Sequence, residues 1–143
     1  MAVSGSARVE GGRELAAALR TGADQIDQLV PVVVIKSATD LTVLTQKNAS
    51  NRPGPNAPTG DYRGSWRVEV NGRRASAGAT EVSAAVGTDR AQANRLEYGF
   101  VGRDSLGREY DQSPYPHHGP AIDVIEPLFE AAMEKVAEKA IPW

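Results

Sequence analysis

Hydrophobic positions in the first third of the chain recur with the period of an α-helix. Four large aliphatic side chains recur at helical spacing on one predicted face: Leu15, Leu19, Ile26 and Leu29. The alanines among them favour helix, so the pattern predicts a helix over residues 10–29. Pro31 follows. Because proline is also well placed in a first helical turn, it marks either a break or a new helix start.

The next segment, residues 32–47, is compatible with two structures. Its first four residues, Val-Val-Val-Ile, have strand propensity. Val34, Ala38, Leu41 and Thr45, however, fall on one helical face, and the segment is longer than a typical strand. We therefore favour a helix.

A period of two replaces the helical period after a stretch rich in proline and asparagine, residues 48–59, which predicts a loop. Apolar residues then alternate with charged ones at Trp66, Val68 and Val70. Asn71-Gly72 is typical of a hairpin turn. With further strands over residues 73–79 and 82–87, the pattern predicts an antiparallel meander that is apolar on one face.

The remaining elements complete a single domain over residues 1–143. Residues 90–99 predict a short helix or a further strand. Residues 101–119 are polar and without periodicity, so we expect a long loop that is mobile in the free chain and orders on assembly. Residues 122–140 have a continuous apolar helical face, in which Pro127 predicts a kink or the true start. This order predicts an α+β fold, a small antiparallel sheet packed on one face by two to three helices.

Composition narrows the classes of function. Apolar residues make up 41% and charged residues 24%, as in an ordinary globular protein, but only 6% is aromatic. The predicted core is therefore thin, which leaves burial for an oligomer interface to supply. The absence of cysteine excludes a disulfide framework and a cysteine nucleophile. The net charge of −2, with scattered Lys and Arg, argues against binding DNA by charge.

No segment predicts targeting to a membrane. Residues 1–12 lack the apolar run of a secretory signal. The longest apolar stretch, residues 29–35, is far shorter than the roughly 20 residues that span a bilayer. We expect a soluble protein that is intracellular where it is made and has no membrane partner.

Candidate catalytic and metal-binding side chains do not combine into a set. His117 and His118 are adjacent and would point in different directions, so we interpret them as a solvated loop pair. Glu97 lies between Leu96 and Tyr98, which predicts partial burial and an ion pair with Arg95 or Arg63. No pattern supplies a nucleophile, a base and an oxyanion donor together, so we expect no catalytic residue, no cofactor and no metal.

The chain contains, in this order, the segments Pro58-Thr59-Gly60 to Trp66, Leu96-Glu97-Tyr98-Gly99-Phe100 and Pro114-Tyr115-Pro116 to Ala121. These three short motifs resemble those of the small tail-completion (neck) proteins of long-tailed double-stranded DNA bacteriophages. The first motif is Pro58-Thr59-Gly60-Asp61-Tyr62-Arg63-Gly64-Ser65-Trp66, and it resembles the family's Thr-Gly, Arg and Ser signature. Leu96-Glu97-Tyr98-Gly99-Phe100 resembles its hydrophobic-Glu-aromatic-Gly element. The segment from Pro114-Tyr115-Pro116 to Gly119-Pro120-Ala121 resembles the proline-aromatic stretch before the last helix. The resemblance spans about residues 10 to 139.

The motifs imply residues for fold and assembly rather than for catalysis. These are Pro58, Thr59, Gly60, Tyr62, Arg63, Ser65, Trp66, Glu97, Tyr98, Gly99, Pro116 and Pro120. Gly60 and Gly99 suit turns that other residues adopt at a cost. Tyr62 and Trp66 are the expected apolar anchors between helix and sheet, and Arg63 with Glu97 is the expected ion pair of this corner.

The resemblance implies a structural virion protein made in the host cytoplasm. Its expected form is a homo-oligomeric ring, a hexamer, at the head–tail junction. The ring would join the connector to the tail-tube proteins and let DNA pass without specific binding. Three alternatives stay open: a tail terminator ring that caps the tail tube, a small hydrolytic enzyme using Glu97, His117 or His118, and a DNA-binding regulator or acidic-protein partner.

Overall fold

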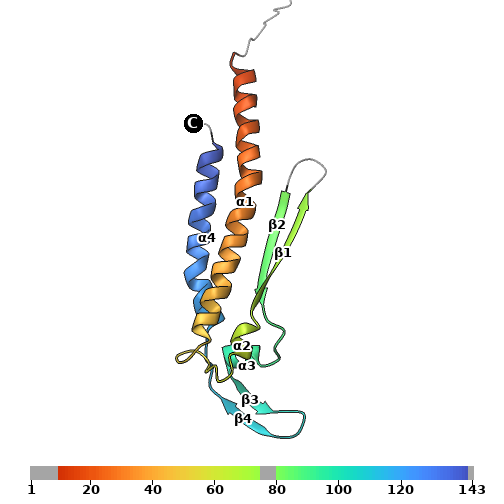
Figure 1. The fold of residues 1–143 in the computed structure, drawn as a ribbon, viewed down its shortest axis with the longest axis vertical. Coiled ribbons are helices and arrows are strands. Elements are labelled where there is room, and N and C mark those ends of the chain that lie inside the picture. The colour runs from red at the N-terminus through yellow and green to blue at the C-terminus, as the bar shows by residue number, and fades with distance from the viewer. Residues whose placement is uncertain (1–9, 75–79, 142–143) are drawn as a thin grey trace, which may run out of the picture.

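The computed structural model of the chain describes residues 10–74 and 80–141, and Figure 1 shows an elongated arrangement of two long helices, an extended ribbon and a small hairpin. The elements in chain order are α1 (Gly12–Asn48), α2 (Asp61–Gly64), β1 (Arg67–Arg74), β2 (Thr80–Gly87), α3 (Ala93–Tyr98), β3 (Phe100–Arg103), β4 (Glu109–Gln112) and α4 (His118–Ala140). Two long helices pack with two small antiparallel sheets, which confirms the α+β fold class.

Helix α1 unites the two helices that the pattern predicted. Helix is confirmed for both segments, and Pro31 lies inside α1 without breaking it. Proline removes one backbone N–H from the helical ladder, a local cost. That cost is offset because α1 packs along α4 and against β2 over much of its length.

Helices α1 and α4 run side by side in opposite directions (Figure 1). At the carboxyl end of α4 the two helices are in close contact at Gly22, where a Cβ atom would lie 2.1 Å from the carbonyl oxygen of Ala140. Because Gly22 has no side chain, the end of α4 can lie in direct contact with α1 at this position. The residues of α1 before Gly22 continue past that end.

The first sheet is a two-stranded ribbon instead of the predicted three-stranded meander. Strands β1 and β2 pair from Arg67↔Gly87 to Arg74↔Thr80. Asn71 and Gly72 lie within β1, so the hairpin turn predicted there is wrong; cross-strand pairing with β2 outweighs the local turn preference of the dipeptide. Of the predicted strand over residues 73–79, the first two belong to β1 and the rest lie outside the described residues.

The interpretation of residues 101–119 as a stretch without regular structure is wrong. Strand β3 pairs with β4, from Phe100↔Gln112 to Arg103↔Glu109. Asp104 builds the turn, because its carboxylate accepts hydrogen bonds from the N–H groups of Leu106 and Arg108, each at 2.9 Å. Such local side-chain contacts leave no periodic pattern. The mobility of this segment in solution stays a prediction.

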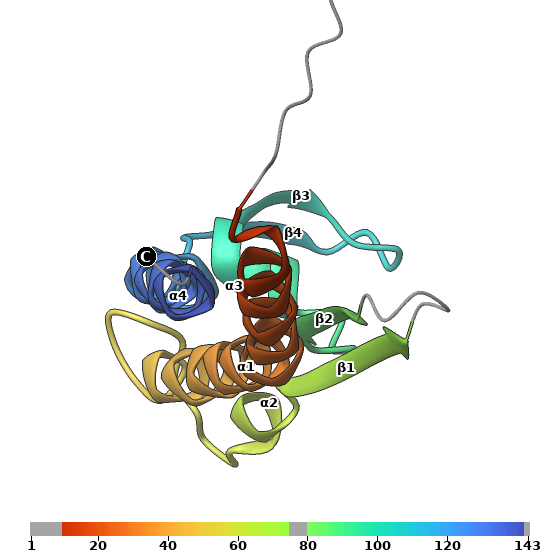
Figure 2. The same cartoon turned by 90° about the horizontal axis from the view of Figure 1, so that it is seen from above.

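The core is small and lies along α1. Its buried apolar side chains are Ala38, Ala49, Trp66, Ala121 and Val136. Seen end-on in Figure 2, α4 lies on one side of α1 and the β1–β2 ribbon on the other. Most large aliphatic side chains on these elements are therefore only partly covered.

Helix α1 also contains an 18-residue window with a mean hydropathy of 1.3, enough by length and composition alone to cross a membrane. The prediction from the short run at residues 29–35 did not include this longer window. One such helix is weak evidence of a membrane span, and 17% of this window is buried in the structure. Here α1 packs on α4 and β2 and has a Lys36–Asp40 ion pair on its surface.

Candidate functional site

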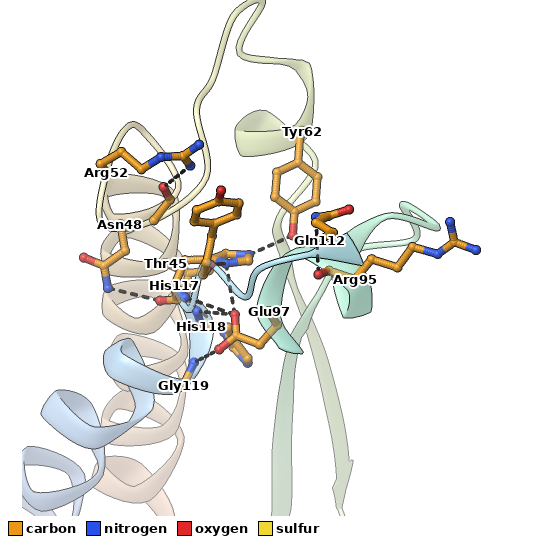
Figure 3. A network of polar contacts seen from close by, with 12 residues as sticks. Thr45, Asn48, Arg52, Tyr62, Arg95, Glu97, Gln112, His117, His118 and Gly119 are labelled. Atoms are coloured by element: carbon orange, nitrogen blue, oxygen red, sulfur yellow. Dashed lines mark hydrogen bonds and ion pairs between the residues drawn. The ribbon is translucent and has the colours of Figure 1, made fainter. Parts of the chain in front are cut away.

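The three motifs of the resemblance meet at one place, where α2, α3 and the start of α4 approach the end of α1 (Figure 3). We call this set the polar hub and define it as Thr45, Tyr62, Trp66, Glu97, His117 and His118. Its members come from segments far apart in sequence: the hydroxyl of Tyr62 contacts His117, 55 residues later. The hub is thus a product of tertiary structure.

Glu97 binds the amino end of α4. Its carboxylate accepts hydrogen bonds from the backbone N–H groups of His117 at 3.0 Å, His118 at 3.0 Å and Gly119 at 2.8 Å. The first N–H groups of a helix lack partners within the helix and form the positive end of its dipole. His117, at the N-cap position, makes no side-chain cap of its own. Glu97 therefore takes the place of a local cap.

The same contacts hold Glu97 ionised. Burial by itself would raise the pKa of this carboxyl group, whose side chain is 11% exposed. The three backbone N–H donors and the nearby His117 ring outweigh burial and lower the pKa below its ordinary value. Glu97 is consequently a fixed anion with most of its acceptor capacity already used.

His117 is fully buried, with both ring nitrogens occupied. Nδ1 lies 2.8 Å from the carbonyl oxygen of Tyr115 and 3.0 Å from the Glu97 carboxylate. Nε2 lies 2.7 Å from the hydroxyl of Tyr62. Because both oxygens near Nδ1 are acceptors, Nδ1 carries a proton and donates to them. The interpretation of His117 as a solvated loop residue is therefore wrong.

His118 is the first residue of α4 and points to a different partner. Its Nδ1 lies 3.0 Å from the Thr45 hydroxyl, and its ring stacks on Trp66 with centroids 4.6 Å apart. Burial lowers the pKa of this imidazole below its ordinary value, although the negative charge of Glu97 acts in the opposite direction. His118 thus joins α4 to α1 and to the start of the ribbon.

Tyr62 and Trp66 close the hub from the side of α2. Their rings meet edge to face at 6.3 Å, and both contact the ring of His117 in the same manner. Burial raises the pKa of Tyr62 to about 12, and the charge of Glu97 adds to this effect. The expectation that Tyr62 and Trp66 anchor the junction of helix and sheet is confirmed, with Trp66 7% exposed.

The predicted ion pair between Arg63 and Glu97 is wrong. The Arg63 guanidinium donates to the Ser50 hydroxyl at 3.2 Å. Arg95, the other candidate partner, lies over the ring of Phe100 at 4.0 Å. Backbone N–H groups at the start of α4 reach Glu97 without the loss of side-chain freedom that an arginine partner requires.

The remaining motif residues shape the backbone around the hub. Gly60 and Gly99 have φ values of +80° and +77°, which confirms the turns expected there. Thr59 accepts the N–H of Asp61 at 3.3 Å, and the Ser65 hydroxyl lies 2.6 Å from both the Tyr62 carbonyl and the Thr88 hydroxyl. The other predicted residues lie at the surface: Pro58, Tyr98, Pro116 and Pro120.

Sequence reasoning missed the contribution of the end of α1. Thr45 is fully buried, and the Asn48 side chain donates to the carbonyl of His117 at 3.1 Å. The Arg52 guanidinium lies 3.7 Å from the centre of the Tyr115 ring. Thr45 was placed on the apolar face of the predicted helix, which indicated its burial. The pattern contained nothing that named His118 as its partner.

The hub is suited to holding elements together rather than to chemistry on a bound molecule. His117 has no exposed surface, and Glu97 is bonded to four donors. Within residues 10–74 and 80–141, no group of three or more His, Cys, Asp and Glu side chains could hold a metal ion. Comparison of the chain with protein-family models, curated sequences and solved structures gives no match. The functional argument therefore depends on the motifs and the geometry.

Proposed function

We propose that this chain is a structural assembly protein, a subunit of a ring at the head–tail junction of a long-tailed bacteriophage. The observation that carries the proposal is the meeting of all three family-like motifs in the polar hub. Tyr62 comes from the first motif and Glu97 from the second, and both contact His117, which comes from the third. The likeness to the neck proteins is thus concentrated at residues that share one structural role, the joining of α2, α3 and α4 in the polar hub.

The distribution of apolar side chains supports an assembly role. Tyr98 and Val101 are each 79% exposed and Leu106 is 75% exposed, all on α3 and the β3–β4 hairpin. We infer that these side chains contribute to contacts with other proteins, because contiguous exposed apolar surface marks such sites. The small core along α1 agrees with a subunit that gains further burial from its neighbours.

The proposed role needs no catalysis and no cofactor. A ring follows when each copy contacts the next through two different surfaces and the rotation closes. We propose six copies, by resemblance to the neck family, located between the connector and the tail tube. The net charge of −2 suits a passage through which DNA slides without adhering.

The tail terminator is the nearest alternative, because it shares the ring and the α+β plan and differs in its place on the particle. The hydrolase alternative gains no support from the hub. Its proposed residues Glu97 and His117 are occupied by internal partners, and His118 contacts Thr45 and Trp66.

Electron microscopy of virions, labelled with an antibody against this chain, tests the proposal. We expect label at the head–tail junction in a few copies per particle, and averaged images of the neck will give the number of subunits. Label at the upper end of the tail tube in tails that lack heads would favour the terminator. Absence of label from virions, with the protein abundant only in infected cells, would overturn a structural role.

A further inference from the structure

An open apolar groove runs between β2 and α4, with α1 as its floor. Its volume is about 480 Å³. The lining residues are mostly aliphatic or aromatic: Val34, Leu41, Val82, Ala84, Ile125 and Phe129. Pockets of roughly 300–1,000 Å³ accommodate groups larger than a single side chain. The groove therefore has room for several apolar side chains of a partner.

Glu126 is the one charged residue in the lining of this groove. Among the residues that the structure describes, it forms no ion pair and no hydrogen bond. A carboxylate next to apolar surface loses hydration when that surface is covered, and a cation on the covering element offsets the loss. An occupant of the groove should therefore combine apolar side chains with a basic one.

The amino end of α1 has this combination. Because α4 ends at the level of Gly22, residues 12–21 continue for roughly ten residues, or about 15 Å, beyond α4. We call this part of α1 the overhang (red in Figure 1). Leu15 and Leu19 are 48% and 51% exposed and lie one turn apart on the same helical face. They continue the face that Gly22 turns toward α4.

Arg20 supplies the basic group. It follows Leu19 in the overhang, is exposed, and has no ion pair or hydrogen bond with the described residues. A long arginine side chain beside an apolar stripe can reach a carboxylate at the edge of a groove. Groove and overhang thus complement one another in both apolar character and charge.

We propose that the overhang of one copy docks in the groove of a second copy, with Leu15 and Leu19 in the groove and Arg20 paired with Glu126. This inference rests on the proposed function and names the contact between neighbours in the ring. The overhang cannot reach the groove of its own chain, because the overhang and the floor of the groove are different parts of one continuous helix, α1. Each copy therefore offers one overhang and one groove, the arrangement of a heterologous interface that closes into a ring.

Sedimentation equilibrium of the full chain tests the apolar part of the contact. We expect the wild type to associate with rising concentration. Leu19→Glu should weaken association at least about tenfold, the effect of losing one buried leucine side chain. The matched control is Ala17→Glu, which adds the same charge to the overhang. Ala17 lies two residues from both Leu15 and Leu19 and so faces away from them, and its variant should change association less than about twofold.

Charge reversal tests the pairing of residues between copies. Arg20→Glu and Glu126→Arg should each weaken association, and the double variant should recover most of it. The double variant Arg20→Glu with Asp111→Arg is the matched control, because it also restores the net charge but leaves Arg20→Glu unpaired with Glu126, so its association should stay weak.

Cross-linking then identifies the contacting surfaces. The chain has no cysteine, so single variants provide unique reactive positions. A flexible bis-maleimide should join Leu19→Cys chains to Ser83→Cys chains in a mixture, since Ser83 lines the groove. Ser105→Cys, exposed in the β3–β4 turn away from the groove, is the matched control and should not join to Leu19→Cys.

Three results would overturn this inference. The first is a wild type that stays monomeric at its highest soluble concentration, and the second is equal association of the Leu19→Glu and Ala17→Glu variants. The third is cross-linking of Leu19→Cys only to itself, which would indicate pairing of two overhangs. These outcomes are independent of virion labelling: label at the neck with unchanged association of Leu19→Glu refutes the docking alone, and association without label refutes the neck assignment alone.

Discussion

At the scale of single residues, the contacts of Glu97 do most to hold the polar hub together. Its carboxylate accepts hydrogen bonds from three backbone N–H groups at the start of α4 and also contacts the His117 ring. Buried donors without partners are costly, so the loss of Glu97 affects α4 as well as α3. The two histidines extend these links, His117 to α2 through Tyr62 and His118 to α1 through Thr45.

We predict that Glu97→Gln lowers the free energy of unfolding by about 1.5–3 kcal/mol, the range for hydrogen bonds to a charged group. The amide keeps the shape of the side chain but has one acceptor oxygen and no charge. Urea unfolding followed by circular dichroism measures the effect. Glu109→Gln is the matched control, since Glu109 is 74% exposed and should change stability by no more than about 0.5 kcal/mol. Equal losses in the two variants would contradict the capping role.

Acid should destabilise the fold in a window set by His118. Its folded pKa is lowered, so the unfolded chain binds the proton first, and stability falls as the pH drops below about 6.5. Glu97, whose folded pKa is also lowered, adds a second loss at lower pH, below about 4.3. We predict that His118→Gln reduces the slope of stability against pH between about 6.5 and 5. Urea unfolding across that range measures it, and an unchanged slope would refute the assignment to His118.

At the scale of elements, the start of α4 and the turn into β3 each depend on a single residue, Glu97 and Gly99. Helix α4 begins without a side-chain cap of its own and depends on Glu97 from α3. The turn from α3 into β3 depends on Gly99, whose φ of +77° and ψ of +174° form a conformation open almost only to glycine. The positions of α4 and of the β3–β4 hairpin therefore depend on a few residues around α3.

We predict that Gly99→Ala destabilises the chain by clearly more than roughly 1–2 kcal/mol, the cost of a left-handed alanine, because the φ and ψ of Gly99 lie in a region that alanine hardly adopts. A Cβ at Gly99 would lie 2.7 Å from the carbonyl oxygen of Gln112. The backbone would have to shift to remove this overlap. Gly107→Ala is the matched control, because Gly107 has the same φ of +77° with nothing within 4 Å of its Cβ position. Thermal unfolding of both variants tests this; similar losses would show that strain alone decides the effect.

At the scale of the whole molecule, little of the apolar surface of the long elements is buried. The core follows α1, while β2 and α4 leave a groove of about 480 Å³ and the overhang extends past α4. In the proposed ring, neighbours that cover these surfaces would stabilise each copy, because binding to the folded state alone shifts the folding equilibrium.

The melting temperature should therefore rise with protein concentration. We predict this for the wild type in differential scanning calorimetry, with a nearly constant value for Leu19→Glu, in which the docking of the overhang is weakened. A melting temperature of the wild type that does not change from dilute to concentrated samples would contradict a link between folding and assembly.

Hydrophobic periodicity predicted the elements with long, repeated patterns. The helical spacing of Leu15, Leu19, Ile26 and Leu29 and the apolar face of residues 122–140 both correspond to real helices. Turn chemistry was less reliable: Asn71-Gly72 lies inside a strand, and the hairpin around Asp104 showed no pattern at all. A short motif records only local preferences, and those are overruled when pairing with a distant strand is stronger.

Some features of the chain were determined by the sequence by itself, and others, most clearly the contacts of the polar hub, only by the tertiary structure. The sequence determined the α+β class, the helical segments, the glycine turns at Gly60 and Gly99 and the partial burial of Glu97, since each follows from local composition or period. The partners of Glu97, the burial of His117 and the pairing of Thr45 with His118 were decided by the fold. The physical reason is that these contacts join segments 20 to 73 residues apart, and no local pattern specifies which distant groups come within hydrogen-bonding distance.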